Sequence, residues 1–410
     1  MSENKSNFMI QQLIEVNAAV ANIRDLDILL ESILTKAREI SNADAGSIYI
    51  RDKSNLHFRV AQNDTLSKNL PKGKKLAYST FTVDIDNSTI SGYVANTGKI
   101  LKIDNVYELS EEVPYKFGKK YDELSNYRTQ SMLTIPLKTI HSHIVGVLQI
   151  INAKDSEGNI IPFDEDIMPI IDFFANSAAI SIERALMTRE LILRMIKMAE
   201  LRDPKETGAH VNRVGAYSVE IYDVWALKKN IPVHELQYNR DVLRIAAMLH
   251  DVGKVGISDL ILKKNARFTT EEFEAMKLHT IYGARLFDEY NSDIDAAASS
   301  IALCHHERWD GSGYPGWIDI HTCEPLNGKR NTEGKPIGRR EEEIPLYARI
   351  VAIADVYDAL SSARIYKEAW SEQDVLDNLE KNSGTQFEPE LISCFFTSLD
   401  TIKSLAERYK

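Results

Sequence analysis

The chain has 410 residues, of which 44% are hydrophobic and 27% are charged, and its formal net charge is −11. This length exceeds what one ordinary hydrophobic core holds, so we expect two domains. The negative charge argues against a general DNA- or RNA-binding protein, which usually presents a basic face. The three cysteines form no CxxC pair, and we find neither a secretory signal pattern nor an apolar run that would span a bilayer. We therefore expect a cytoplasmic protein without a disulfide framework or membrane anchor.

Helical and strand-like patterns alternate through the first part of the chain. Apolar residues recur at helical spacing over about residues 8–41, and we expect residues 1–24 to form an N-terminal helix ahead of the first domain. Residues 46–63 then alternate between apolar and polar side chains, which predicts a β-hairpin. A short helix with a strand, and then two more strands, are predicted at residues 90–106, 131–138 and 143–155.

The order of these elements, the segment SGYVANTGK and the strand pair PL…GVLQIINAK resemble those of GAF domains over residues 25–185. The resemblance implies an α/β (α+β) sensor domain, and it does not identify the effector. Five residues loosely resemble a pattern of some cyclic-nucleotide-binding GAF domains: Asn152, Lys154, Phe163, Asp164 and Glu165. We favour the simpler interpretation of a strand end, a turn and a helix cap, because a shared fold does not identify a ligand.

A long helix with almost no breaker residue is predicted over about residues 163–201, and we expect residues 165–200 to connect the two domains. Four apolar residues lie four, seven and three positions apart, as the seam of a parallel homodimer requires: Ile182, Leu186, Leu193 and Ile196. Arg189 interrupts this seam, and the alternative is an amphipathic helix that packs on its own domain. We favour a homodimer through this helix.

The second part of the chain, residues 190–410, has a helical pattern apart from a Gly- and charge-rich interruption at about 316–343. We expect an all-α domain here. Most of its histidines and several acidic residues fall in five short segments. Eight of them are candidate metal ligands: Glu206, His210, His250, Asp251, His279, His305, His306 and Asp355.

Several of these candidates lie within or directly after apolar helical runs, where an unpaired imidazole or carboxylate would cost several kcal/mol. Ligands that converge from separate helices build dinuclear metal centres in helical bundles. Nitrogen and oxygen donors without a thiolate suit iron, manganese, zinc or cobalt. Taken singly, each residue has a simpler explanation, such as a hydrogen-bonded core histidine, a solvated Glu206, or an Asp355 that pairs with an arginine. Their conjunction favours a metal cluster.

The segments HDVGK, HHERWDGSGYP and ADVYDALSSARIYK, in this order, resemble the HD-GYP family of the HD phosphohydrolase superfamily over about residues 190–400. The signature residues are Gly313, Tyr314 and Pro315. The resemblance implies that the eight candidates bind two or three divalent metal ions, with iron or manganese expected, and that Asp251 bridges ions. Members with a Glu at the position of Glu206 hold three ions rather than two.

The resemblance also implies hydrolysis of a cyclic dinucleotide to a linear product. Cyclic di-GMP is the expected substrate, and linear pGpG and possibly GMP are the expected products. Asp251 and Lys254 are the candidate catalytic residues, and Lys254 would stabilise negative charge on the phosphate. The simpler explanation of Lys254 is that it is a surface lysine at a helix end. Substrate recognition is expected around Tyr314, Arg364 and Lys367, because an arginine fork and a lysine suit a second phosphate.

Two departures from the family pattern concern substrate recognition. The common R-P-Y-K run is here Arg364-Ile365-Tyr366-Lys367, and about twenty extra residues lie between Pro315 and Ile344. A loop of this length is often either functional or disordered, and as a hypothesis the insertion covers the site and biases substrate choice. Two rival functions remain: a catalytically silent cyclic-dinucleotide receptor, and an HD-superfamily phosphohydrolase that acts on another nucleotide.

Overall fold

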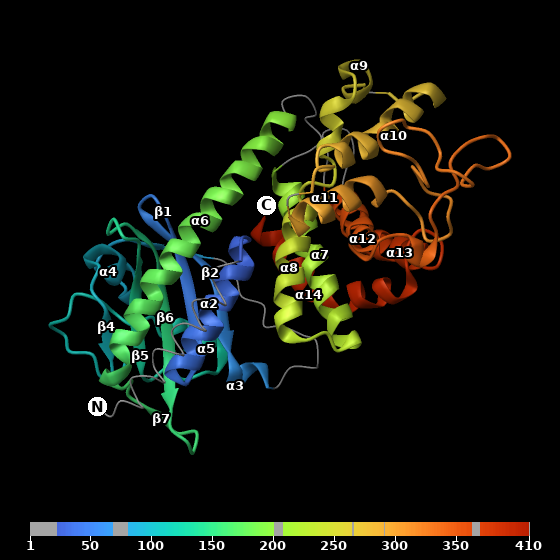
Figure 1. Cartoon of the computed structure of the whole chain (residues 1–410). Helices are drawn as coiled ribbons and strands as arrows, with labels where there is room; N and C mark the ends of the chain where they lie inside the picture. Colours follow the sequence, from blue (N-terminus) through green and yellow to red (C-terminus); the bar gives the residue numbers. More distant parts are fainter. Residues whose placement is uncertain are drawn as a thin grey trace, which may run out of the picture. The chain divides into compact units, whose positions relative to one another are not determined.

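The computed structural model divides into two compact units, Met1–Arg189 and Glu190–Lys410 (Figure 1). The structure describes residues 23–68, 81–200, 208–264, 266–290, 292–362 and 370–409. Some predictions lie outside these residues, namely most of the helix at 1–24 and the side chains of Glu206, Arg364 and Lys367. No helix among the described residues is both long enough and apolar enough to cross a membrane.

The first unit is built on one antiparallel sheet with the strand order β3-β2-β1-β6-β5-β4, and β7 pairs with β6. The predicted hairpin is confirmed, since β1 and β2 pair in antiparallel register up to the turn between Asp52 and Asn55. The later strands are confirmed as well. The strands are β1 (Ala43–Asp52), β2 (Asn55–Asn63), β3 (Thr82–Asp84), β4 (Leu101–Ile103), β5 (Met132–Lys138), β6 (Ile144–Lys154) and β7 (Ile160–Ile161).

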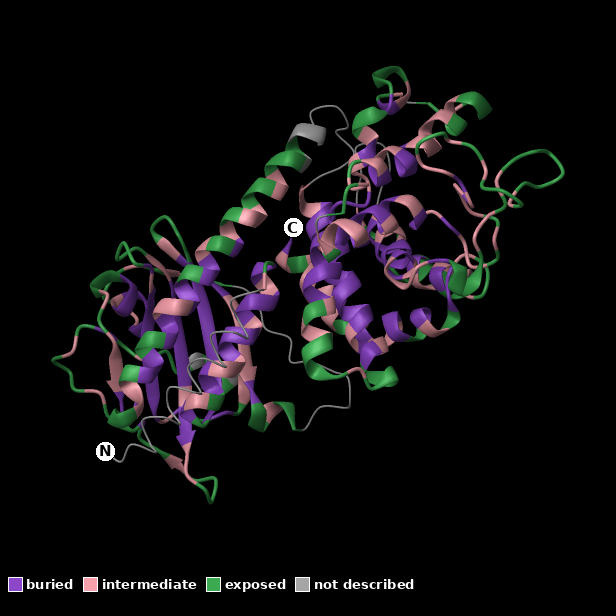
Figure 2. Ribbon diagram, viewed as in Figure 1, coloured by how far each residue is buried: buried purple, intermediate pink, exposed green. Residues whose placement is uncertain are grey.

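Helices cover both faces of this sheet. Side chains on a strand alternate between the faces, so Ile48 and Ile50 pack into the core with α2 and α6, whereas Tyr49 packs with α4. In Figure 2 the strands of this sheet are mostly buried. Asp25 begins α2, because its carboxylate accepts hydrogen bonds from the backbone N–H groups of Asp27 and Ile28. The helices are α2 (Leu26–Ser41), α3 (Asp64–Ser67), α4 (Ile90–Thr97), α5 (Lys120–Ser125), η1 (Glu165–Ile167) and α6 (Met168–Glu200).

The residues that resemble a nucleotide-binding GAF pattern have structural partners. Nδ2 of Asn152 donates to the Tyr127 hydroxyl at 2.9 Å, and Lys154 forms an ion pair with the buried Asp44. Asp164 caps η1. These contacts support the simpler interpretation of a strand end, a turn and a helix cap.

The dimer seam predicted on α6 is wrong in its position. Ile182 is fully buried in the core between α2, α6 and the sheet, and Leu186 packs against the same core. Leu193 packs beside Val211 in the second unit, and the side chain of Ile196 lies outside the described residues. The periodicity is that of a helix packed on its own domain.

The second unit is helical, as predicted, and its core lies between α7, α8, α11, α12 and α14. Gly215 lets α7 lie close to α8, because a Cβ at this position would lie 2.9 Å from the carbonyl oxygen of Arg244. The insertion at 316–343 contains two isolated bridges and ends in η3. The helices are α7 (Gly208–Lys229), α8 (Val233–Ala247), η2 (Val252–Gly256), α9 (Asp259–Leu262), α10 (Thr270–Arg285), α11 (Asp293–Cys304), η3 (Glu341–Glu343), α12 (Leu346–Ser361), α13 (Glu372–Lys381) and α14 (Pro389–Arg408).

Candidate metal centre

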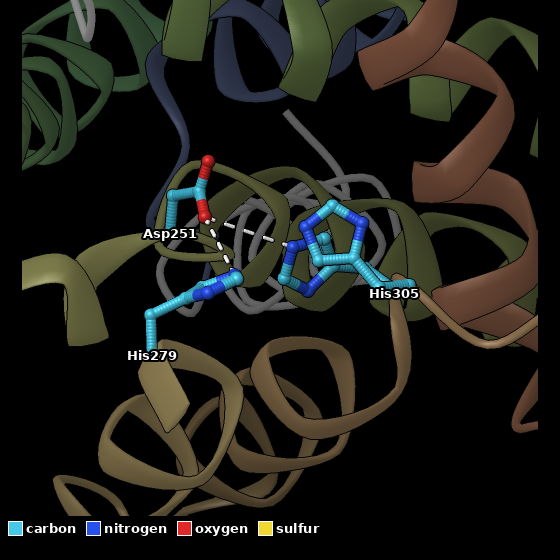
Figure 3. A group of neighbouring side chains, drawn as sticks. Asp251, His279 and His305 are labelled. Atoms are coloured by element: carbon cyan, nitrogen blue, oxygen red, sulfur yellow. Dashed lines mark ion pairs between the residues drawn. The ribbon is translucent and has the colours of Figure 1, made fainter. Parts of the chain in front are cut away.

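A first group of potential ligands forms where three segments of the second unit meet. Asp251 comes just before η2, His279 lies on α10, and His305 and His306 directly follow α11. Oδ1 of Asp251 lies 3.2 Å from Nε2 of His279 and 3.7 Å from Nε2 of His305 (Figure 3). One ligand atom from each of the four residues lies within 4.8 Å of the others, a spacing that a single ion could bridge.

A second group comprises His210 on α7, His250 just after α8, and Asp355 on α12. Nε2 of His210 lies 3.5 Å from Oδ1 of Asp355, and Nε2 of His250 lies 3.8 Å from the same oxygen. Their ligand atoms also lie within 4.8 Å of one another. The structure thus brings together seven of the eight predicted ligands, and Glu206 lies outside the described residues.

Asp251 joins the two groups. Its Oδ1 faces the first group, whereas its Oδ2 lies 3.3 Å from Nε2 of His250 in the second group. A carboxylate whose two oxygens face different sets of imidazoles has the geometry of a bridging ligand between two cations. This arrangement agrees with the role that the sequence resemblance implied for Asp251.

Hydrogen bonds at Nδ1 orient three of the imidazole rings. Nδ1 of His250 lies 2.9 Å from the carbonyl oxygen of Ala247, and Nδ1 of His279 lies 2.7 Å from that of Met276. Nδ1 of His305 lies 3.0 Å from the carbonyl oxygen of Ile301. A carbonyl accepts only, so each Nδ1 carries a proton and Nε2 is the nitrogen of each ring that faces the centre and can bind an ion.

Two of these ring nitrogens test whether the residues suit a metal ion. Nε2 of His279 and Nε2 of His305 are buried, and neither forms a hydrogen bond of good geometry with any residue that the structure describes. A buried polar atom without a hydrogen bond is costly, and a cation at this position would satisfy both nitrogens. The donor set therefore fits a metal ion.

The protonation states also suit metal binding. Burial opposes ionisation of Asp251, but the Lys254 ammonium and the His250 ring outweigh it and hold the pKa of this carboxyl well below its usual value. Burial, followed by the neighbouring His305 and His279, holds the pKa of His306 well below its usual value. Asp251 is thus ionised and His306 is neutral, the forms in which a carboxylate and an imidazole bind metals.

His210 is oriented differently, by a residue that the sequence analysis missed. Its Nδ1 lies 2.8 Å from Oδ2 of Asp358, which is almost fully buried on α12. Arg213 holds this carboxylate with two hydrogen bonds, from Nε at 2.6 Å and from Nη2 at 2.8 Å. Burial raises the pKa of Asp358, but its bonds to His210 and Arg213 outweigh burial and lower it. The only signal in the sequence was a second Asp three positions after Asp355, on the same helix face.

Gly253 in HDVGK explains how η2 reaches α10. A Cβ at this position would lie 2.0 Å from the carbonyl oxygen of His279 and 2.3 Å from the backbone nitrogen of Gly283. Only glycine permits this backbone contact. The contact places Asp251 beside His279.

Two of the other predicted site residues lie beside the first group. Nζ of Lys254 is 2.7 Å from Oδ2 of Asp251, and the Tyr314 ring lies 4.9 Å from the His306 ring, measured between centroids. The predicted substrate residues Arg364 and Lys367 lie outside the described residues.

Glu307 fixes the loop that carries Tyr314. The sequence analysis did not predict a role for this residue. Its buried carboxyl accepts hydrogen bonds from the backbone N–H of Gly316 at 2.7 Å and of Arg339 at 3.2 Å. Burial raises the pKa of Glu307 to about 7. In the same loop Gly311 has a φ of +81°, whereas Gly313 is required for space, because a Cβ would lie 2.4 Å from the backbone nitrogen of Arg308. Glu307 thus holds both ends of the insertion.

Comparisons with known families assign both halves of the chain. Residues 25–182 match the family model of the GAF domain, and residues 207–360 match that of the HD domain. The first range contains the antiparallel sheet with its helices. The second contains all seven of the candidate ligands described above.

Curated relatives come from bacteria. The chain is 33% identical over 213 residues to a 3'3'-cGAMP-specific phosphodiesterase of Vibrio cholerae, covering 52% of this chain and 35% of the relative. It is 37% identical over 220 residues to a cyclic di-GMP phosphodiesterase of Thermotoga maritima, covering 53% of this chain and 52% of the relative. A cyclic di-GMP phosphodiesterase of Vibrio cholerae is 31% identical over 284 residues, covering 67% of this chain and 53% of the relative. The chain thus spans between a third and about half of the length of these relatives. The chain thus contains a segment that matches the GAF domain followed by one that matches the HD domain, and about half or more of it is similar to parts of bacterial cyclic-dinucleotide phosphodiesterases.

Proposed function

We propose that this protein is a metal-dependent phosphodiesterase of the HD-GYP type that hydrolyses a cyclic dinucleotide. Its main substrate in this proposal is cyclic di-GMP, and the product is linear pGpG. The observation that carries the proposal is the pair of adjoining ligand groups that share the Asp251 carboxylate. The relatives named above support the substrate class. The GAF domain would regulate the activity.

In this proposal the two groups of residues would hold divalent ions, which would supply an activated water and positive charge beside the phosphate. Lys254, 2.7 Å from Asp251, places an ammonium beside the reacting phosphate and stabilises the charge that develops on its oxygens. Tyr314 lies beside His306 and would orient the substrate next to the first group. Arg364 and Lys367 would bind the second phosphate of the cyclic dinucleotide.

The donors also guide the choice of metal. Five imidazoles with two carboxylates and no thiolate suit iron or manganese, which we propose as the natural ions. Glu206 would add a ligand for a third ion. Elemental analysis of protein purified without oxygen tests both points, because it gives the identity of the metal and the number of ions per chain.

Incubation of the metal-loaded protein with a panel of cyclic dinucleotides, followed by separation of the products, tests the activity. We expect linear dinucleotide from the wild type, and neither product nor full metal content from His279→Ala. Tight binding of cyclic di-GMP without any product would favour the silent receptor. Turnover of a nucleotide monophosphate or triphosphate alone would favour another HD-superfamily phosphohydrolase.

We also propose a homodimer, now through a different face of α6. Phe173, Ile180 and Met187 follow one another at seven-residue intervals and are 52%, 39% and 63% exposed. A seven-residue apolar repeat is the spacing of a helix pair. Analytical ultracentrifugation should give a dimer for the wild type and a monomer for Ile180→Glu. A wild type that remains monomeric at micromolar concentration would contradict the homodimer.

A further inference from the structure

A row of aromatic rings leads from the first ligand group to the surface of the second unit. The Tyr314 ring lies 4.9 Å from the His306 ring on one side and 6.2 Å from the Phe273 ring on the other, measured between centroids. Phe273 lies on the first turn of α10, and it is 44% exposed. The row thus ends in an aromatic side chain that solvent reaches.

A cation accompanies the two outer rings. Nζ of Lys277, one turn after Phe273 on α10, lies 4.8 Å from the Phe273 centroid and 5.4 Å from the Tyr314 centroid. The ammonium also donates to Oε1 of Glu274 at 2.7 Å. An ammonium has three N–H donors, so the bond to Glu274 leaves others available for a ligand.

The helix that carries this pair is firmly held at its start. Thr269 and Glu272 form a capping box, in which the Thr269 side chain bonds the backbone of Glu272 and the Glu272 side chain bonds that of Thr269. Glu272 also pairs with Lys264 at 2.5 Å. Phe273 follows directly, so its ring is presented from a fixed backbone rather than from a mobile loop.

A single exposed Phe is common on protein surfaces and needs no function. Here the exposed ring is continuous with a ring that touches a potential metal ligand, and an ammonium lies over both outer rings. Aromatic faces beside positive charge are how proteins bind unpaired nucleobases next to phosphates. We propose that Phe273 and Lys277 form a base-binding site for one nucleobase of the cyclic dinucleotide, an assignment that rests on the proposed function.

The two side chains have different roles in binding the base. Phe273 stacks on the base, a contact that every base can make. Lys277 donates to acceptors on the base edge, and guanine presents two of these, O6 and N7, whereas adenine presents an amino donor in place of O6. Lys277 therefore favours guanine over adenine, and the pair contributes to substrate selection as well as to binding.

Steady-state kinetics of Phe273→Leu on the full-length, metal-loaded protein tests the stacking role. We expect KM for cyclic di-GMP to rise by about 5- to 150-fold, the range that loss of one base-stacking contact gives. kcat, the metal content and the hydrolysis of methyl p-nitrophenyl phosphate, a diester without a nucleobase, should remain at wild-type values. Tyr290→Leu is the matched control, because Tyr290 is another exposed aromatic residue of this unit (60% exposed) and should leave all four quantities unchanged.

Lys277→Gln tests the second role with the same assays. We expect it to lower the preference for cyclic di-GMP over cyclic di-AMP while the metal content stays constant. A KM of Phe273→Leu within about twofold of the wild type would overturn the inference. So would a parallel loss of metal or of model-diester hydrolysis, which would make Phe273 a structural residue. A wild type that cleaves the model diester but no cyclic dinucleotide would overturn the proposed function, and the base-binding site with it.

Discussion

Asp358 and Arg213 set His210 apart from the other histidines of the centre. Three rings are oriented by backbone carbonyls, whereas His210 depends on a carboxylate that Arg213 holds with two hydrogen bonds. A carboxylate hydrogen-bonded to Nδ1 of an imidazole fixes the tautomer of the ring and makes Nε2 a stronger ligand for a metal ion. The second ligand group is therefore more easily weakened by a distant substitution than the first.

Asp358→Asn should weaken metal binding at the second group by about 10- to 100-fold, the usual effect of losing such a support. The group of Asp251, His279, His305 and His306 should keep its ion. Elemental analysis after dialysis at limiting metal concentration would then find one ion fewer per chain. His279→Ala is the matched comparison, because it removes a ligand of the first group. Equal metal content in Asp358→Asn and the wild type would show that Asp358 has no part in metal binding.

The structure brings together seven of the eight candidate ligands, which the sequence could indicate because each of the seven is a His or Asp within a recognisable motif. Asp358 was less visible. Its partner Arg213 lies 145 positions earlier in the chain, and nothing in the local pattern of either residue predicts their contact. Phe273 was missed for a related reason, since an aromatic residue on an amphipathic helix has the same spacing whether it faces the core or solvent.

At the scale of elements, the approach of η2 to α10 places the shared carboxylate. Gly253→Ala would put a methyl group 2.0 Å from the carbonyl oxygen of His279, so one backbone must move. We expect a loss of about 1–3 kcal/mol in the free energy of unfolding, typical of overpacking, together with reduced metal content. Thermal unfolding and elemental analysis would measure both. Gly118→Ala is the control, because a Cβ there would meet no atom within 4 Å, and it should change neither quantity.

The insertion at 316–343 is the element that the family resemblance explains least. Glu307 binds the backbone near both ends of the insertion. Lys329 and Arg339 also lie over the Trp317 ring, with Nζ and Cζ at 4.2 Å and 3.8 Å from its centroid. Trp317 and Ile337 are joined by a backbone hydrogen bond of 2.9 Å, so a short linker could replace residues 319–335.

We expect this deletion to change the ranking of cyclic di-GMP against cyclic GMP-AMP while the metal content stays constant. The reason is that the ends of the insertion flank the loop that carries Tyr314. Turnover measured with both substrates would test this. An unchanged ranking and rate would leave the insertion without a role in substrate choice.

At the scale of the whole molecule, the order of a mixed α/β domain, a long helix and a helical domain was predictable because strand and helix patterns differ in period. The surface against which the long helix packs was not predictable. Ile182 and Leu186 have the spacing of a dimer seam, but a helix packed on its own domain requires the same spacing. Hydrophobic periodicity predicts that a face is buried, and it does not predict what buries it.

The bonds between the histidine Nδ1 atoms and backbone carbonyls have a practical consequence for experiments. We expect the rings to keep this arrangement without an ion, because they are held by helices that fold around an apolar core. Treatment with a chelator should therefore abolish turnover and leave the far-ultraviolet circular dichroism spectrum unchanged, unlike in small domains that unfold without zinc. A single preparation could then be emptied and refilled with iron, manganese or cobalt in turn, so that the effect of each metal is compared on one and the same polypeptide.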